Sequence, residues 1–470
     1  MTLTQLFGRE IIYTDVGAIT AENVCAELTQ ALSYQSKNET EIKYLYNYYR
    51  GQQPILQRVK EVRPEINNKV VVNRANEIVA FKVGYLMGEP VQYVCRGNDS
   101  GHAEGLITLN GYMADEEKQS KDREIAEWNH ICGTAYRMVL PASDRTDDES
   151  PFVIYTLDPR YAFVVYSSEL GNRPMMGVKY VKLQDGAVVY SIYTDREYFE
   201  IRDGHITAQA PHALGMIPII EYPANTERMG AFEAVMPLLD AINTVESNRL
   251  DGIEQFIQAL MVFKGVNIES DDYKRLRQQG AICINTDSSI ETLVEQLDQM
   301  QTQTLVNDMY DTVLTICGMP NRNGGTSTSD TKGAVIFRDG WSSAEGRAKN
   351  SEMMFRSSER VFLRLALKLA ADVRGLVLMP GHIDIRFTRR NYENVMEKMQ
   401  VLVGMLSSHM VDPLLAFEHC GMFADPQAAY QRSMAYAESK RAEMEKQLTL
   451  QAHAHDSEDD DAVNGNDEPV

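Results

Sequence analysis

The sequence predicts an α+β protein in which a mixed helix-and-strand region precedes several long helices. Residues 151–223 alternate Tyr, Val and Ile between turn dipeptides, as antiparallel strands do. Two apolar stripes with helical spacing follow, over residues 231–260 and 290–317. The chain has 470 residues, which at about 150 residues each leaves room for about three domains.

The N-terminal 230 residues combine both kinds of element. Apolar residues recur at helical spacing over 75–86, and Gly88-Glu89-Pro90 then predicts a stop, followed by a strand over 91–95. A second helix is expected over 115–132. Asp185-Gly186 and Asp203-Gly204 predict hairpin turns within the strand region. Its tyrosines could stack nucleic-acid bases, but Tyr is also a good sheet former, and we favour that role.

The two long helices that follow form a predicted hairpin with a small β-containing tip. The first would be roughly 45 Å long at 1.5 Å per residue, and short strands are expected at 260–263 and 281–285. These two helices carry ten acids against Arg249 alone, a net charge of −9. The acids are Glu233, Asp240, Glu246, Asp251, Glu254, Glu291, Glu295, Asp298, Asp308 and Asp311.

A polar Gly/Ser/Thr-rich loop after Pro320 leads into a third helix, expected over 331–375, where nine bases face five acids. Four of the bases are spaced by four and so share one helix face: Arg356, Arg360, Arg364 and Lys368. This row has two interpretations. It forms salt bridges between helices or subunits, with Glu352 and Glu359 nearby, or it faces phosphates.

The C-terminal part is predicted to contain a strand over 382–389 and helices over 391–450, broken at Asp412-Pro413 and Asp425-Pro426. The end of the chain, residues 451–470, is acidic and almost devoid of apolar residues. We expect it to be disordered, because it cannot bury enough apolar surface to offset the entropy of folding.

Composition excludes several classes of protein. With 46 Lys and Arg against 67 Asp and Glu, the net charge of −21 disfavours tight nucleic-acid binding by phosphate neutralisation. The six cysteines are scattered without a Cys-x-x-Cys pair, which indicates buried thiols rather than disulfides or zinc ligands. No apolar run reaches the roughly 20 residues of a membrane span, and no signal peptide is evident. A soluble cytosolic chain without a membrane partner is expected.

No catalytic constellation emerges from the sequence. Gly324-Gly325 precedes Lys332, but the order of residues does not match a phosphate-binding loop. A Gly-x-Ser-x-Gly elbow and a His-Glu-x-x-His zinc motif are both missing. His453 and His455 lie in the acidic tail, which lacks the rigidity that a metal site needs. We therefore expect no catalytic residue, no metal and no cofactor.

Three segments resemble the portal proteins of tailed bacteriophages of the siphophage type. They are residues 48–55 (Tyr-Tyr-Arg-Gly-Gln-Gln-Pro-Ile), 63–73 (Arg-Pro-Glu-Ile-Asn-Asn-Lys-Val-Val-Val-Asn) and 84–91 (Gly-Tyr-Leu-Met-Gly-Glu-Pro-Val). The order of elements agrees over most of the chain, although the C-terminal third carries no signature of its own. These segments are structural signatures, not catalytic motifs.

The resemblance implies a portal fold with an α/β wing, a two-helix stem, a small clip, a long kinked helix and a helical crown. The segments would be the wing 1–230, with its Tyr-rich β region 151–223, the first stem helix 231–263, the clip 264–289, the second stem helix 290–318, the tunnel loop 319–333, the kinked helix and return strand to the wing 334–390, the crown 391–450 and the tail 451–470.

It also implies roles for individual residues. A DNA-tunnel loop would comprise Asn321, Arg322, Asn323, Gly324, Gly325, Thr326, Ser327, Thr328, Ser329, Asp330 and Lys332. An acidic stem lining would comprise Asp240, Glu246, Asp251, Glu254, Glu295, Asp298, Asp308 and Asp311. A clip that docks a motor would use Lys264, Asp271, Asp272, Lys274, Arg275 and Arg277, while the row from Arg356 to Lys368 would face DNA or a neighbouring subunit.

The function implied is a ring of about twelve identical subunits at one capsid vertex, through which double-stranded DNA is packaged and ejected. Expected partners are the terminase large subunit, a head-to-tail adaptor, the major capsid protein and the scaffold protein, in the virion and, during assembly, the host cytoplasm. An acidic lining would repel phosphates at short range and so prevent DNA from sticking. The alternative is that these acids only solvate an exposed helix face.

Two other classes of function remain open. One is a divalent-metal nuclease or phosphotransferase using clustered carboxylates such as Asp271 and Asp272, although acids spread along helices do not converge on one concave site. The other is a cytosolic helical scaffold unrelated to phages, which would form no ring with a DNA-sized bore.

Overall fold

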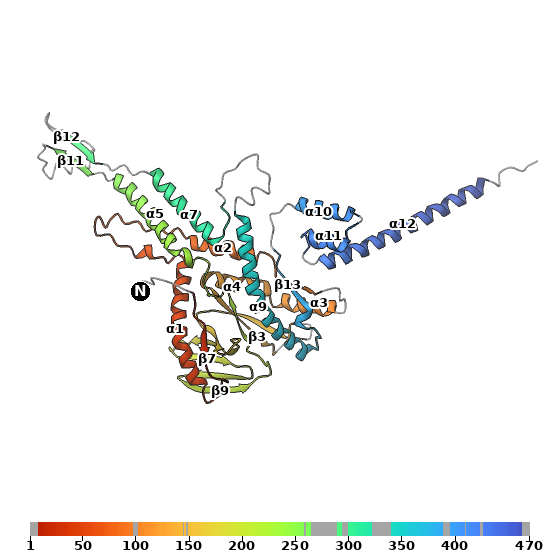
Figure 1. Ribbon diagram of the computed structural model, residues 1–470, viewed down its shortest axis with the longest axis horizontal. Helices are drawn as coiled ribbons and strands as arrows, with labels where there is room; N and C mark the ends of the chain where they lie inside the picture. Colours follow the sequence, from red (N-terminus) through yellow and green to blue (C-terminus); the bar gives the residue numbers. More distant parts are fainter. Residues whose placement is uncertain are drawn as a thin grey trace, which may run out of the picture. The chain divides into compact units, whose positions relative to one another are not determined.

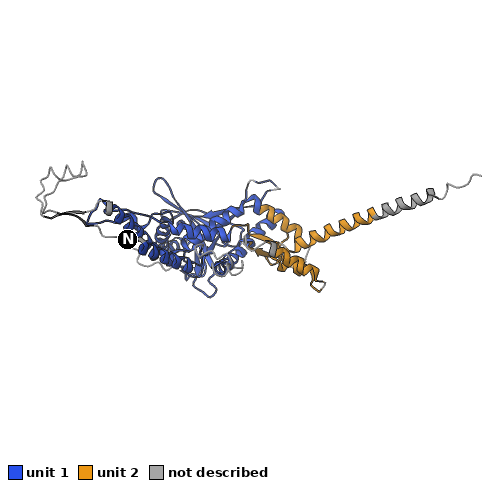
Figure 2. Cartoon of the chain, turned by 90° about the horizontal axis from the view of Figure 1, so that it is seen from above, with its two compact units in different colours: residues 1–87, 113–375 blue, residues 88–112, 376–470 orange. Residues whose placement is uncertain are grey.

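A computed structural model describes residues 8–96, 102–143, 145–146, 149–257, 260–264, 289–293, 299–321, 340–388, 395–408, 410–423 and 426–462. The chain divides into two compact units (Figure 2). Unit 1 comprises residues 1–87 and 113–375, and unit 2 comprises residues 88–112 and 376–470. Each unit is described below by itself.

The larger sheet of unit 1 has six strands in the order β1-β5-β6-β7-β8-β9. β1 (Ile12–Thr14) runs parallel to β5 (Ala162–Ser167). β6 (Pro174–Lys182), β7 (Val188–Tyr193), β8 (Glu197–Arg202) and β9 (His205–Pro211) continue it as an antiparallel meander. Both predicted hairpins are confirmed. At the second, Asp203 and Gly204 take φ values of 51° and 77°, as a tight hairpin turn requires.

Helix α1 (Val24–Tyr49) packs against this sheet and closes its core. Val24 and Leu28 lie in one cluster with Phe163 and Phe199, all of them almost fully buried. The tyrosines of the sheet also serve structure: the Tyr180 hydroxyl lies 3.0 Å from Glu39 Oε2 and 2.8 Å from the Arg160 carbonyl oxygen. This is the sheet-forming role that the sequence favours for them.

A second sheet of unit 1 has the order β10-β3-β4, from β10 (Ile219–Pro223), β3 (Thr134–Pro141) and β4 (Phe152–Leu157). The helix predicted over 75–86 is confirmed as α2 (Arg74–Leu86). The helix expected over 115–132 is confirmed as α4 (Lys118–Cys132), and it is preceded by α3 (Ala103–Asp115), which the sequence pattern did not predict. The two helices are separated because Glu117 takes a left-handed conformation, with φ 48°, that a continuous helix does not allow.

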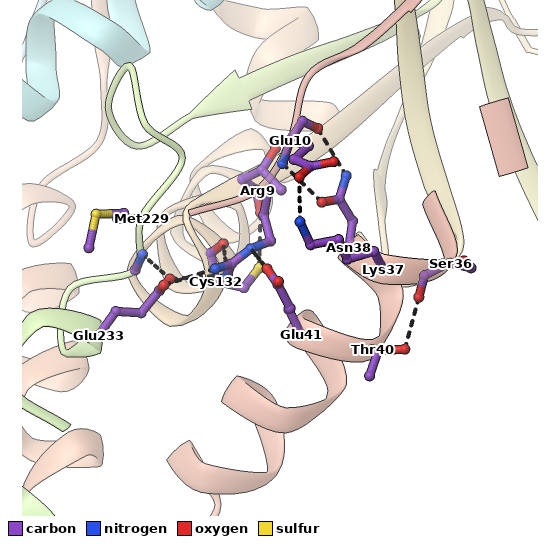
Figure 3. Close-up of polar contacts among 12 residues, drawn as sticks. Arg9, Glu10, Ser36, Lys37, Asn38, Thr40, Glu41, Cys132, Met229 and Glu233 are labelled. Carbon is purple, nitrogen blue, oxygen red and sulfur yellow. Dashed lines mark hydrogen bonds and ion pairs between the residues drawn. The ribbon is translucent and has the colours of Figure 1, made fainter. Parts of the chain in front are cut away.

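An ion cluster around Arg9 joins the segment before β1 to α1 and to the start of the expected first stem helix (Figure 3). The Arg9 guanidinium donates to both carboxylate oxygens of Glu233, at 3.0 and 2.8 Å, and lies 3.0 Å from Glu41 of α1. It also donates to the Cys132 carbonyl oxygen at 3.1 Å. Since Glu233 opens the short 3-10 helix Glu233–Val235 that precedes the first stem helix, Arg9 helps to set where that helix starts.

The expected stem is a helical hairpin in which α5 (Met236–Ile257) lies beside α7 (Gln299–Cys317) (Figure 1). β11 (Leu260–Lys264) and β12 (Ser289–Leu293) pair antiparallel, Leu260 opposite Leu293. The prediction that the second helix begins at residue 290 is therefore wrong: residues 289–293 form a strand. A short apolar run fits both periodicities, and pairing with β11 decides between them. The strand expected at 281–285 lies outside the described residues.

Helix α9 (Trp341–Arg374) is the longest helix described in unit 1, and residues 331–339 of the expected helix lie outside the described part. In unit 2, β13 (Ile383–Arg386) pairs with β2 (Gln92–Cys95) beside the 3-10 helix Pro380–His382, and α3 falls largely in the same unit. The strand predicted over 91–95 is confirmed. The sequence assigns it to the wing, whereas the division into compact units groups it with the C-terminal residues.

The C-terminal helices of unit 2 are α10 (Val395–Ser407), α11 (Pro413–His419) and α12 (Pro426–Ala462). Both predicted breaks are confirmed, since Pro413 and Pro426 each begin a helix, where the missing N–H is not needed. α12 continues to Ala462, past residue 451 where disorder is expected to begin. That stretch contains no Gly or Pro, so nothing in its backbone stops a helix there.

The pH dependence of stability provides a first prediction, centred on His130 of α4. Burial lowers the pKa of His130 to about 3, with a smaller contribution from Lys82, and its Nε2 has no hydrogen-bond partner among the described residues. Below pH of about 6.5 the unfolded chain binds a proton that the folded chain excludes, so the free energy of unfolding should fall by up to about 1.4 kcal/mol per pH unit.

Replacing His130 with Leu should reduce this slope between pH 6.5 and 4.5, as measured by urea denaturation at several pH values. Carboxylates also titrate toward the acid end of that window, so the contribution of His130 is the difference in slope between the variant and the unmodified chain. His212, whose pKa burial also lowers, is the matched control, because it is only partly buried. A variant at His212 that changes the slope as much as the His130 variant would contradict the assignment.

Candidate functional site

The first stem helix has two opposite faces that contact different parts of the chain. On one face, Asn243 and Ser247 accept hydrogen bonds from the backbone N–H groups of Val72 (2.8 Å) and Val70 (3.0 Å). Arg249 lies about 200° around the helix from Ser247, at about 100° per residue, and donates to Gln303 of α7 at 2.7 Å. The helix α5 is therefore held between residues 54–72 on one side and α7 on the other (Figure 1).

Asp251 anchors the segment of residues 54–70, which we call the 54–70 segment. Asp251 is 3% exposed, and its carboxylate accepts hydrogen bonds from the backbone and side-chain nitrogens of Asn68, at 2.8 and 2.9 Å. Lys60 Nζ lies at 2.9 Å and Arg58 Nη2 at 3.3 Å. Burial alone would raise the pKa of Asp251, but the hydrogen bonds from Lys60 and Asn68 outweigh it and lower the pKa.

The foot of α7 is fixed against α2. The Arg74 guanidinium stacks 3.8 Å from the centre of the Tyr310 ring and pairs with Glu77 at 2.7 Å, and the Tyr310 hydroxyl donates to Glu77 at 2.7 Å. These residues border a cavity of about 440 Å³ that Asn321 also lines. The contacts therefore position the end of α7, where the expected tunnel loop begins.

The acids expected along the stem fall into two groups. Asp251 is buried in the anchor just described, and Asp240 accepts a 2.9 Å hydrogen bond from Tyr48. Asp308 and Asp311 of α7 are exposed, and Glu246 is partly exposed, 3.8 Å from Arg249. Partly exposed Glu254 lies one turn beyond Asp251, while Glu295 and Asp298 lie outside the described residues. The solvent-exposed negative charge therefore lies mainly on the face of α7 that carries Asp308 and Asp311, which we call the outer face of α7.

Most of the expected tunnel loop and clip lies outside the described residues. Asn321 is described, and its side-chain nitrogen donates to Asp311 at 3.0 Å. Lys264 is the last residue of β11, opposite Ser289. The expected residues outside the described part are Arg322, Asn323, Gly324, Gly325, Thr326, Ser327, Thr328, Ser329, Asp330, Lys332, Asp271, Asp272, Lys274, Arg275 and Arg277.

The row of bases on α9 does not act as one unit. Lys368 Nζ donates to the carbonyl oxygens of Ala213 (2.7 Å) and Leu214 (2.9 Å), so it stabilises a turn inside unit 1. Arg356 is partly buried, whereas Arg360 and Arg364 are exposed. The exposed pair is what remains for contacts with another molecule.

Glu359, expected to pair with that row, belongs to a fully buried ion network instead. Arg137 of β3 lies 3.1 Å from Glu359 and also pairs with Asp122 of α4. Lys118 Nζ completes the network at 2.8 Å from Glu359 and 2.6 Å from Asp122. The Tyr222 hydroxyl donates to Glu359 at 2.8 Å. Through these contacts α9 is fixed to the β10-β3-β4 sheet. The sequence analysis did not predict this network. Its one signal in the sequence is Arg137, a basic residue within the otherwise mostly apolar strand β3.

Two features that would suggest other functions are missing from the described parts of the chain. Within those residues, no group of three or more His, Cys, Asp or Glu side chains is placed to hold a metal ion. No helix among them is both long enough and apolar enough to cross a bilayer. What the stem offers is a charged surface and a set of intramolecular anchors.

Two comparisons with known proteins agree with each other. The family described as "Phage portal protein, SPP1 Gp6-like" matches residues 33–450 of this chain. The portal protein of Bacillus phage SPP1 is 20% identical over 432 residues, which cover 84% of this chain and 80% of that protein. These matches confirm the resemblance noted from residues 48–91, and they extend it through the stem and the C-terminal helices. The chain belongs to the SPP1 Gp6-like family of phage portal proteins.

Proposed function

We propose that this chain assembles into a closed ring at one vertex of a phage capsid and forms the channel through which double-stranded DNA enters and leaves. Membership of the portal family supports the proposal, together with a stem hairpin that leaves Asp308 and Asp311 exposed. In this assignment α5 and α7 are the stem, β11 and β12 border the clip, and the helices from α10 onward form the crown. The tunnel loop would comprise residues 319–333.

Helix dimensions make such a channel wide enough. A dozen helices, each about 10 Å across and standing side by side, trace a circle about 40 Å wide, which leaves a bore of about 30 Å. Duplex DNA fits within that bore with a layer of ions. The number of subunits, about twelve, is part of the proposal.

The charge of the outer face of α7 suits a channel that DNA must pass without binding. Carboxylates repel phosphates at distances under about 10 Å and are screened beyond that in ordinary salt. A basic lining would instead release counterions and hold the duplex. Asp311 of α7, which is exposed, and Glu246 of α5, which is partly exposed, are the acids that remain for this role, while buried Asp251 is left out of it.

The proposed ring is structural and uses no cofactor. Its partners would be the terminase large subunit at the clip, a head-to-tail adaptor, the major capsid protein and the scaffold protein. In this proposal hydrolysis belongs to the terminase, and the ring resides in the virion.

End-on electron microscopy of the purified full chain, alone and with scaffold protein, tests the ring. We expect closed rings with a central opening wide enough for a duplex. Compact monomers at every concentration, with or without scaffold protein, would contradict the proposal.

Replacing the partly exposed Glu246 and the exposed Asp311 with lysine should make the ring bind duplex DNA. Rings carrying Glu246→Lys and Asp311→Lys gain up to two attachment points per subunit, and each phosphate contact steepens the salt dependence of binding. We expect co-sedimentation with linear duplex DNA at low salt for the variant and not for the unmodified ring. Rings with Glu22→Lys and Glu169→Lys, two acids outside the stem, are the control. Equal retention by both variants would show that net charge alone is responsible.

A further inference from the structure

The 54–70 segment exposes two apolar side chains at its tip although its base is firmly anchored. Ile55 and Ile66 are 7% and 1% exposed, and Asp251 holds Lys60 and Asn68. In contrast, Val59 and Val62 are 83% and 78% exposed. Val59 and Val62 lie three positions apart on an anchored segment, so they offer an apolar surface that a second molecule can cover.

The outer face of α7 offers a matching surface. Val306 is 8% exposed and faces inward, while Leu305 is 50% exposed and Asp308 is exposed. At about 100° per residue, Leu305 and Asp308 lie about 60° apart on one flank of the helix, away from Val306. Asp311 lies about 60° further round, so it remains open toward a channel.

These two surfaces face in opposite directions. The 54–70 segment covers the α5 face of Asn243, Ser247 and Asp251, whereas α7 covers the face of Arg249. A ring with head-to-tail contacts requires two different, complementary surfaces on opposite sides of each subunit. The stem of this chain has that arrangement.

Height and charge also match. Cyclic symmetry places equivalent residues of all copies at one level. The 54–70 segment is anchored to α5 at the level of Ser247 and Asp251. Gln303 of α7 lies at the level of Arg249, between these two residues. The tip of the segment in one copy therefore comes level with Leu305 in the next copy.

The charges of the two surfaces are opposite. The 54–70 segment has four bases and two acids, a net charge of +2, whereas α7 has two acids and no base, a net charge of −2.

We propose that residues 59–63 of one subunit pack on Leu305 and Asp308 of α7 in the next subunit, Val59 and Val62 against Leu305 and Arg63 beside Asp308. This contact rests on the proposed ring and specifies which surfaces close it. Both surfaces would therefore be covered by neighbouring copies of this chain.

Thiol cross-linking of assembled full-length rings tests the contact. A variant with Val59→Cys and Leu305→Cys, treated with a short bis-maleimide, should give a ladder of covalent multimers on a denaturing gel. Each single variant should stay at the background of the unmodified chain, because a head-to-tail contact brings two different positions together. Leu170→Cys with Leu305→Cys is the matched control, since Leu170 is fully exposed but lies in the turn between β5 and β6.

A charge exchange provides a second readout. Asp308→Arg or Arg63→Asp alone should lower the yield of rings several-fold, and the double variant should restore it. Asp is tolerated at position 63, where φ is 53°. Rings visible by microscopy with no ladder from the Cys pair and no rescue would overturn this contact and leave the proposed ring standing. Failure to form rings under any condition would instead overturn the proposed function.

Discussion

Replacing Arg137 with Met should lower the free energy of unfolding by about 3–5 kcal/mol, the cost of breaking a buried ion network by removing one partner. Arg137 is fully buried and pairs with Asp122 and Glu359, and its guanidinium also donates to the Tyr222 hydroxyl at 3.1 Å. The variant leaves the buried carboxylates of Asp122 and Glu359 without Arg137, while Lys118 still pairs with both of them. Urea denaturation followed by circular dichroism measures the loss.

The matched control is Arg202→Met. Arg202 pairs with Asp185 at 2.9 Å on β8, but both side chains are about half exposed, so that pair is expected to contribute no more than about 1 kcal/mol. Adding Glu359→Gln to Arg137→Met should recover part of the lost stability, because it removes one of the two charges left without Arg137. Equal losses in the free energy of unfolding for the two arginine variants would show that burial does not explain the contribution of the network to stability.

Replacing Asp251 with Ala should release the 54–70 segment from α5. The carboxylate accepts three hydrogen bonds from Asn68 and Lys60, and charge-assisted bonds contribute about 1.5–3 kcal/mol each. Part of this loss is regained when the freed groups meet water, so we expect a local destabilisation of about 3 kcal/mol. Backbone amides of the segment should then exchange with solvent about a hundredfold faster, because each 1.4 kcal/mol corresponds to about a factor of ten.

Hydrogen exchange measured by mass spectrometry tests this, with Glu254→Ala, one turn further along α5, as the control. The pKa of Asp251 is lowered in the folded chain, so its stabilisation is present above the unfolded pKa of about 3.9 and is lost as pH falls through the lower folded value. The difference between the variant and the unmodified chain should therefore stay constant from pH 5 to 8. Unchanged exchange across residues 58–68 would contradict the anchoring role.

Much of the architecture could be read from local patterns. The alternation of Tyr, Val and Ile with turn dipeptides predicted the meander from β5 to β9, and helical spacing predicted α2, α5 and most of α7. Residues 48–91 carried the resemblance that the family match confirms. The helices α1 and α3 and the strand β3 were not predicted. β12 was assigned to a helix because a short apolar segment fits more than one period.

The sequence by itself determined most of the strands and helices, the acidic character of the two long helices and the resemblance to phage portal proteins. Only the tertiary structure decided which charges stay open. It placed Asp251 beside Asn68, and Glu359 beside Arg137, partners separated by 183 and 222 positions in the chain. Local periodicity carries no information about such pairs. A carboxylate becomes a buried anchor or an exposed surface charge only when the folded backbone brings a base to it or leaves it in water.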